Sequence, residues 1–128
     1  MSREQTVIDR IENYLVDISR WYLNIHGNYR GVDGTPDIIT VDDAGRLLAI
    51  EAKKAGEQPK VNQWRRMIEI LTSGGRCVVA YPDIEMAQVL SGPLEIATAV
   101  GGIIGQSEFE VALTARGRTS EIILKGVA

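Results

Sequence analysis

The sequence has little cysteine, histidine or phenylalanine, and each of these occurs only once in 128 residues. A single cysteine cannot form a disulfide within the chain. Because Cys77 lies in an apolar run, 77–81, we expect a buried thiol in a reducing compartment. One histidine cannot supply the several side chains of a zinc site, so we expect His26 to be a loop or capping residue.

Long hydrophobic runs and a secretory leader are also missing. No apolar stretch approaches the roughly 18 residues of a membrane span, and the N-terminus lacks the basic-then-apolar order of a signal peptide. These absences predict a protein of the cytoplasm, in a bacterial or phage-infected cell, with no membrane partner.

Positive charge is not in excess either, because 14 basic and 17 acidic residues give a net charge of -3. This balance disfavours a protein that coats nucleic acid through a general positive field. Five basic residues nevertheless gather between 53 and 66, where either a local phosphate-binding rim or ordinary solvent-facing charge accounts for them: Lys53, Lys54, Lys60, Arg65 and Arg66.

The hydrophobic pattern that is present fits a single domain over 1–128, since domains usually hold about 100–150 residues. Apolar spacings of three and four predict a first helix from 4 to about 23. Two strands apolar on both faces, a second helix after Pro59 and a third strand then predict an α/β core with a sheet covered on both sides. The expected strands are 38–41, 47–52 and 76–81, and the second helix is 61–72.

The C-terminal part, 82–128, is expected to be an elaboration of unassigned role on a core that covers about 4–81. We expect helical segments at 86–90 and 94–100. Strands at 109–113 and 121–124, joined through 116–118, are expected to form a closing hairpin.

The turn between the first two strands sets the register of the residues that carry the chemistry. Gly45 suits the left-handed position of a three-residue loop, 43–45, in which case paired residue numbers sum to 88. Asp37 then lies opposite Glu51, with Cβ atoms about 5 Å apart. Carboxylates so close repel each other unless a cation such as Mg²⁺ lies between them. Lys53, two residues along the strand, shares the face of Glu51.

These residues carry a family resemblance. A Gly-Thr-Pro-Asp turn at 34–37, an Ile-Glu-Ala-Lys strand at 50–53, Gln63 twelve residues after Glu51, and a helix that opens Glu-Gln-Thr-Val at 4–7 occur in this order. The pattern resembles the PD-(D/E)XK nuclease superfamily, and within it the VRR-NUC branch of Holliday-junction-resolvase-like proteins. The resemblance implies a restriction-endonuclease-like core of helix, mixed sheet, helix and strand.

The resemblance also assigns roles to residues. It implies that Asp37 and Glu51 ligate Mg²⁺ or Mn²⁺, with help from the Ala52 carbonyl, and that Lys53 orients water or stabilises charge. Gln63 would support the site or touch phosphate. Glu4 would complete the acidic set from the apolar face of the first helix, where an unpaired carboxylate is costly. Glu12, on the flank of that face, is the rival ligand.

The implied activity is metal-dependent endonucleolytic cleavage of DNA. A homodimer that cuts branched DNA is the specific hypothesis, because two sites related by a two-fold axis match the symmetry of a four-way junction. Two other hypotheses stay open. One is a non-catalytic nuclease-fold module for DNA binding or interaction, and the other is a nuclease subunit that depends on a partner for its substrate.

Overall fold

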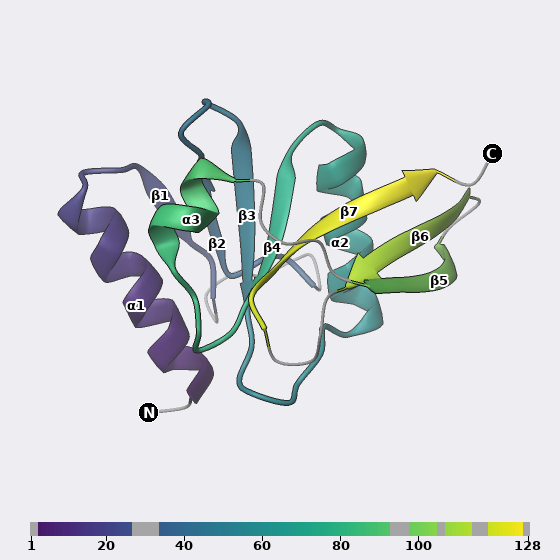
Figure 1. The fold of residues 1–128 in the computed structure, drawn as a ribbon, viewed down its shortest axis with the longest axis horizontal. Helices are drawn as coiled ribbons and strands as arrows, with labels where there is room; N and C mark the ends of the chain where they lie inside the picture. Colours follow the sequence, from purple (N-terminus) through teal and green to yellow (C-terminus); the bar gives the residue numbers. More distant parts are fainter. Residues whose placement is uncertain (1–2, 27–33, 93–97, 105–106, 114–117, 127–128) are drawn as a thin grey trace.

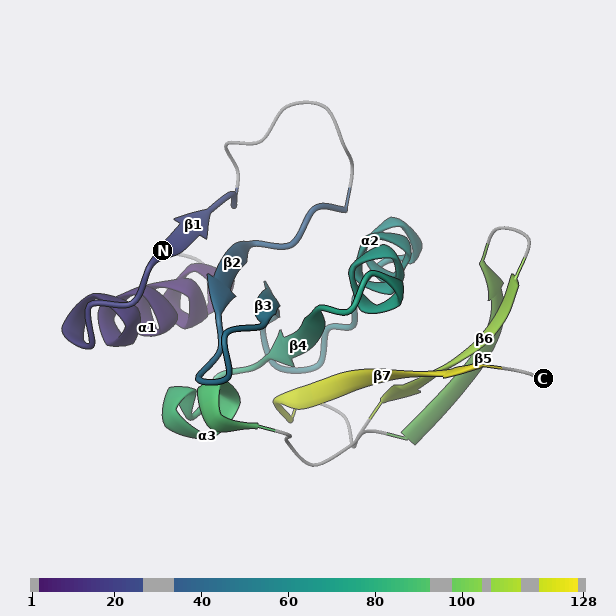
Figure 2. The ribbon, with the colours of Figure 1, turned by 90° about the horizontal axis from the view of Figure 1, so that it is seen from above.

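In this computed structural model, residues 3–26, 34–92, 98–104, 107–113 and 118–126 are described. They form a mixed sheet with helices on both of its faces (Figures 1 and 2). The helices are α1 (Arg3–Asp17), α2 (Val61–Thr72) and α3 (Met86–Ser91). The strands are β1 (Tyr22–Asn24), β2 (Ile38–Val41), β3 (Leu47–Ala52), β4 (Arg76–Ala80), β5 (Thr98–Ile104), β6 (Ser107–Leu113) and β7 (Ser120–Gly126). None of the described helices is long and apolar enough to cross a membrane.

The sheet has the strand order β1-β2-β3-β4-β7-β6-β5 over the described residues. Strands β3 and β4 are parallel, as expected for strands joined through a helix, and the other neighbours are antiparallel. The first residues of β7 pair with β4 and its later residues pair with β6. The predicted α/β class with a mixed sheet is confirmed.

The β2–β3 hairpin has the predicted register. Val41 pairs with Leu47 and Ile38 pairs with Ile50, so the paired numbers sum to 88. The Asp42 amide donates to the Arg46 carbonyl at 2.8 Å, and Gly45 has φ +83°, in the left-handed region that a glycine adopts without strain. The short glycine turn therefore fixes which residues of the two strands face each other.

Both faces of the sheet are covered, as predicted from the apolar strands. On one face α1 and α3 pack on side chains such as Leu48 and Ile50, and on the other α2 packs on Ala49 and Val79. Figure 2 shows α2 on the side of the sheet opposite α1 and α3. The predicted strands 38–41 and 47–52 and the helix 61–72 have the predicted bounds, and Cys77 is buried as expected.

The first helix is shorter than predicted, because α1 ends at Asp17 rather than near residue 23. Ser19 adopts φ +55°, and the Arg20 amide donates to the Leu15 carbonyl at 2.8 Å. This left-handed residue ends the helix at a position where glycine is usual. Tyr22 then lies in β1, antiparallel to β2. The chain therefore turns back along the sheet where a continuous helix was expected.

The C-terminal elaboration also differs from the prediction in one segment. Residues 98–100, expected to be helical, belong to β5, while 94–97 lie outside the described residues. The β-branched side chains of 98–104 and a full antiparallel register with β6 favour the strand. The predicted antiparallel pairing of the last two segments is confirmed, with Ala112 opposite Ile123; residues 114–117 of their connection are not described.

Candidate metal centre

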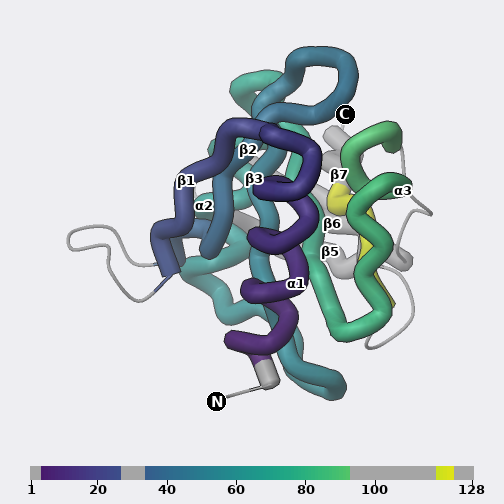
Figure 3. Tube along the Cα trace, turned by 90° about the vertical axis from the view of Figure 1, so that its left-hand side faces the viewer, coloured from purple at the N-terminus to yellow at the C-terminus, as the bar shows by residue number. Residues whose placement is uncertain are grey.

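Four elements meet at one end of the sheet, and each brings a side chain to the predicted site. Asp37 directly precedes β2, Glu51 lies near the end of β3, and α1 and α2 both begin at this end. Figure 3 shows the start of α1 at the same end of the molecule as the loop that follows β3. The antiparallel hairpin and the parallel β3–β4 pair thus bring residues far apart in the sequence to one edge.

Asp37 is held by groups on two sides. Its side chain is buried, and Oδ2 accepts a hydrogen bond from the Ala52 amide at 2.8 Å. Its Oδ1 lies 2.6 Å from Nδ1 of His26. The backbone carbonyl of Asp37 accepts from the Ile25 amide at 2.7 Å, which fixes the start of β2 against the end of β1. Ala52 thus contacts the site through its amide, and the role that the resemblance implies for its carbonyl stays a prediction.

Glu51 is the most unusual group of the site. Its side chain is 2% exposed, and Gln63 Nε2 donates to its Oε1 at 3.0 Å. Its Oε2 is buried without a hydrogen-bond partner among the described residues. Burial raises the pKa of Glu51 to about 9; the charges of Asp37 and Glu4 raise it too, while the charge of Lys53 lowers it. The ionised form of Glu51 is therefore unfavourable unless a positive charge lies close to it.

Gln63 is aimed at Glu51 by the start of α2. Its Oε1 accepts from the Lys60 amide at 2.8 Å, so its amide nitrogen is the end that faces Glu51. Gly34, with φ +82°, lies so close to this turn that a Cβ there would be 2.3 Å from the Asn62 carbonyl oxygen. The glycine of the 34–37 turn therefore lets the first turn of α2 approach the carboxylates.

Lys53 lies just beyond the end of β3, and its amide donates to the Ala80 carbonyl at 2.8 Å. Its side chain is 4% exposed, which is rare for a lysine, and its charge lowers the pKa of Glu51. Lys53 is therefore electrostatically coupled to Glu51, as their spacing of two residues predicted.

The helix acid beside Asp37 is Glu4. Ligand atoms of Glu4, His26 and Asp37 all lie within 4.8 Å of one another, and Glu4 Oε1 is 3.8 Å from His26 Nδ1. Glu12 instead hydrogen-bonds Tyr22 and raises its pKa. Of the two acids that the sequence left open, the structure brings Glu4 to the cluster and leaves Glu12 with Tyr22.

His26 lies in a turn, as expected, but its place against Asp37 and Glu4 was not predicted. The signal that would have located it is the run Trp-Tyr-Leu-Asn-Ile at 21–25, whose aromatic and branched residues favour a strand. Once 22–24 pair with β2, Ile25 falls beside Asp37 and His26 follows at the site.

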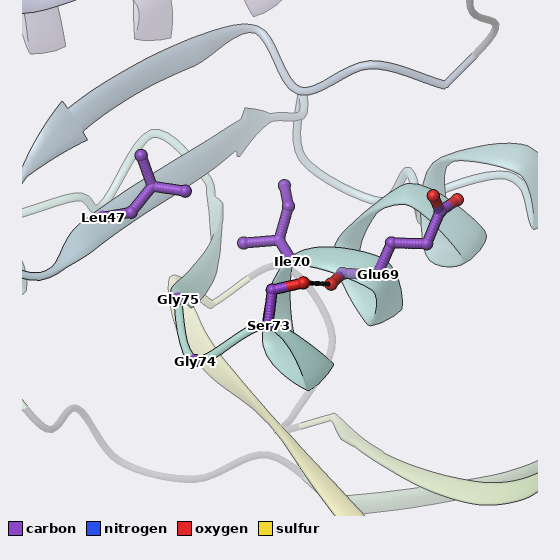
Figure 4. A pocket seen from close by; sticks show the side chains of 6 residues that line it. All are labelled: Leu47, Glu69, Ile70, Ser73, Gly74 and Gly75. Atoms are coloured by element: carbon purple, nitrogen blue, oxygen red, sulfur yellow. Dashed lines mark hydrogen bonds between the residues drawn. The ribbon is translucent and has the colours of Figure 1, made fainter.

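A pocket at the other end of the sheet offers a contrast (Figure 4). It lies between the start of β3 and the end of α2, where the Ser73 hydroxyl donates to the Glu69 carbonyl at 2.9 Å. Its one ionisable side chain, Glu69, is exposed and paired with Arg66. The pocket has no converging set of charged groups, so the candidate site is the carboxylate end. The pocket is lined by Leu47, Glu69, Ile70, Ser73, Gly74 and Gly75.

No protein-family model matches the sequence, and a search of curated proteins finds no similar one. The function therefore has to be inferred from the arrangement of Glu4, His26, Asp37, Glu51 and Lys53.

Proposed function

We propose that this protein is a divalent-metal-dependent endonuclease that hydrolyses phosphodiester bonds in DNA. The observation that carries the proposal is the buried Glu51, whose Oε2 has no partner among the described residues, beside the second buried carboxylate of Asp37. Two buried acids in contact are costly unless a cation neutralises them. Their placement agrees with the order of residues in the PD-(D/E)XK pattern and with a restriction-endonuclease-like core.

The donor set fits a hard divalent cation. Asp37, Glu51 and Glu4 offer carboxylate oxygens, which are the ligands preferred by Mg²⁺ and Mn²⁺. When bound, such a cation polarises a phosphoryl oxygen and lowers the pKa of an attacking water. A cation here would lie beside the Oε2 of Glu51, which has no hydrogen-bond partner among the described residues.

The remaining residues have roles that follow from their positions. The buried ammonium of Lys53, next to Glu51, supplies positive charge where negative charge develops on a reacting phosphate. Gln63 holds one oxygen of Glu51 through its amide nitrogen and leaves the other oxygen available. Gln63 thereby orients Glu51, and Lys53 favours its ionised form.

For the substrate we propose branched DNA, cut by a homodimer. A chain of 128 residues has little surface for reading sequence, and paired sites would suit the two-fold symmetry of a junction. Net charge of -3 favours recognition through a local basic rim over binding through a general positive field.

The test is cleavage of labelled four-way junction, forked, single-stranded and plain duplex DNA with Mg²⁺ or Mn²⁺. We expect metal-dependent cutting that falls at least about 100-fold in Glu51→Gln and in Lys53→Met. Glu4→Gln is compared with Glu12→Gln, an acid of the same helix outside the cluster, and only Glu4→Gln should reduce cutting. Tight DNA binding without cutting by the wild type would favour the non-catalytic module or the missing partner instead.

A further inference from the structure

We propose that His26 is a direct ligand of the metal in this site, and that it makes the site select Mn²⁺ over Mg²⁺. The inference deepens the proposed function, since it concerns the same centre, but it has a readout that does not depend on DNA cleavage.

The atoms are spaced as one ion requires. In octahedral coordination at about 2.1 Å, neighbouring ligand atoms are about 3 Å apart and opposite ones about 4 Å apart. His26 Nδ1 lies 2.6 Å from Asp37 Oδ1 and 3.8 Å from Glu4 Oε1, and the three ligand atoms lie within 4.8 Å of one another. Small movements around an ion would bring all three into its coordination sphere.

His26 is held in this position by its own backbone. Its amide donates to the Asn24 side-chain oxygen at 2.8 Å, and the preceding Ile25 amide donates to the Asp37 carbonyl at 2.7 Å. The second bond ties the end of β1 to the start of β2, and the imidazole lies against Asp37.

Glu51 gives a second, independent indication that a cation belongs here. It is 2% exposed, its Oε2 has no hydrogen-bond partner among the described residues, and the amide of the next residue, Ala52, donates to Asp37 of the cluster. A buried carboxyl group with an unpartnered oxygen therefore lies beside the cluster of Glu4, His26 and Asp37.

The imidazole decides which cation fits best. Mg²⁺ takes oxygen ligands and keeps several of its waters, whereas nitrogen ligands suit transition metals. Carboxylates with one imidazole form a mixed set, and of Mg²⁺ and Mn²⁺ only Mn²⁺ is a transition metal. Selection for Mn²⁺ therefore follows from the one nitrogen among the candidate ligands.

The first experiment is pulsed electron paramagnetic resonance on the tag-free protein loaded with Mn²⁺. Because the chain contains one histidine, any ¹⁴N coupling of a directly bound imidazole belongs to His26 without isotope labelling. We expect that coupling in the wild type and in Glu12→Gln, and its loss in His26→Gln. Bound Mn²⁺ without imidazole coupling in the wild type would overturn the proposal, since His26 would then only hydrogen-bond Asp37.

Calorimetric titration with Mn²⁺ and with Mg²⁺ tests the selection. We expect the wild type to bind Mn²⁺ at least tenfold more tightly than Mg²⁺, and His26→Gln to lose at least tenfold in Mn²⁺ affinity with little change for Mg²⁺. An equal loss for both ions would overturn the selection. Mn²⁺ binding with imidazole coupling but no cleavage of any DNA would remove the proposed nuclease activity alone.

Discussion

A buried aspartate lies at each end of β2, Asp37 before the strand and Asp42 after it, and the two carboxylates have different partners. Asp42, which follows the strand, accepts hydrogen bonds from the Ala44 and Arg46 amides at 3.0 and 2.8 Å. Its other oxygen is bound by Arg46 Nε at 3.1 Å and by Arg76 Nη1 at 3.2 Å. Although burial raises the pKa of Asp42, these bonds lower it below the ordinary value. The protein itself satisfies this carboxylate completely.

Arg76 completes that end of the sheet. Its guanidinium also donates to both oxygens of Glu121 on β7 and to the Val89 carbonyl at 2.9 Å. The bond to Glu121 raises the pKa of Arg76 most. Asp42, Arg76 and Glu121 therefore form a closed network that joins the hairpin, β4 and β7, and it leaves no role for an external ion.

The end at Asp37 is not closed in this way. Glu4, Asp37 and Glu51 bring three acids, Lys53 brings one permanent positive charge, and one oxygen of Glu51 has no partner among the residues that the structure describes. The fold therefore neutralises the buried carboxylates at the Asp42 end with its own cations. At the Asp37 end the acids outnumber the permanent positive charges, which is the arrangement that the proposed cation would balance.

Removal of Arg76 should have the largest effect on stability. Arg76→Met leaves Asp42 and Glu121 buried without their common partner, so we expect unfolding to need about 4 kcal/mol less free energy. Urea denaturation with and without metal measures the change, which should be the same in both conditions. Arg66→Met, which breaks an exposed pair with Glu69, is the control and should cost less than about 1 kcal/mol.

A side chain at Gly34 should disturb the metal end instead. Gly34→Ala forces a Cβ to within 2.3 Å of the Asn62 carbonyl oxygen at φ +82°, and we expect a loss of about 3 kcal/mol together with weaker metal binding. Thermal unfolding and Mn²⁺ titration provide the two measurements.

Gly56→Ala is the matched control for Gly34. Gly56 has φ +84° but nothing within 4 Å of an added Cβ, so only the backbone cost of about 1 kcal/mol should remain. Equal effects of the two substitutions would show that the approach of α2 to the 34–37 turn is unimportant.

Glu51→Gln should have an effect of opposite sign that depends on pH. Because the folded pKa of Glu51 is about 9 and the ordinary value is 4.5, ionisation opposes folding increasingly as pH rises between these values. In EDTA the variant should therefore match the wild type near pH 4 and become the more stable of the two as pH rises toward 8. Urea unfolding across this range measures it, and a pH-independent difference would contradict the assigned burial cost.

The parts of the site that the sequence predicted depend on short-range rules. Gly45 and a three-residue loop determine the register that pairs the two strands, and alternation then places Lys53 near Glu51. The start of α2 follows Pro59, and it brings Gln63 twelve residues after Glu51 to the same place. Each of these inferences needed only neighbours in one or two adjacent elements.

The parts that it did not predict depend on rarer local geometry or on distant contacts. Ser19 ends α1 with a positive φ that sequence patterns assign to glycine, so β1 and therefore His26 were misplaced. The choice between Glu4 and Glu12 required the packing of α1 on the sheet. The pairing of Arg76 with Glu121, 45 residues apart, had no local signature at all.

Strand β7 also has a consequence for how this chain can change over evolution. Its residues 120–122 pair with β4, and its later residues pair with β6 rather than with the core. Among the described strands, β5 and β6 are thus hydrogen-bonded to the rest of the sheet through β7 alone. Insertions and exchanges of sequence in β5 and β6 should be tolerated without moving the carboxylates, so the two strands form a segment in which lineages can diverge while the opposite end stays constant.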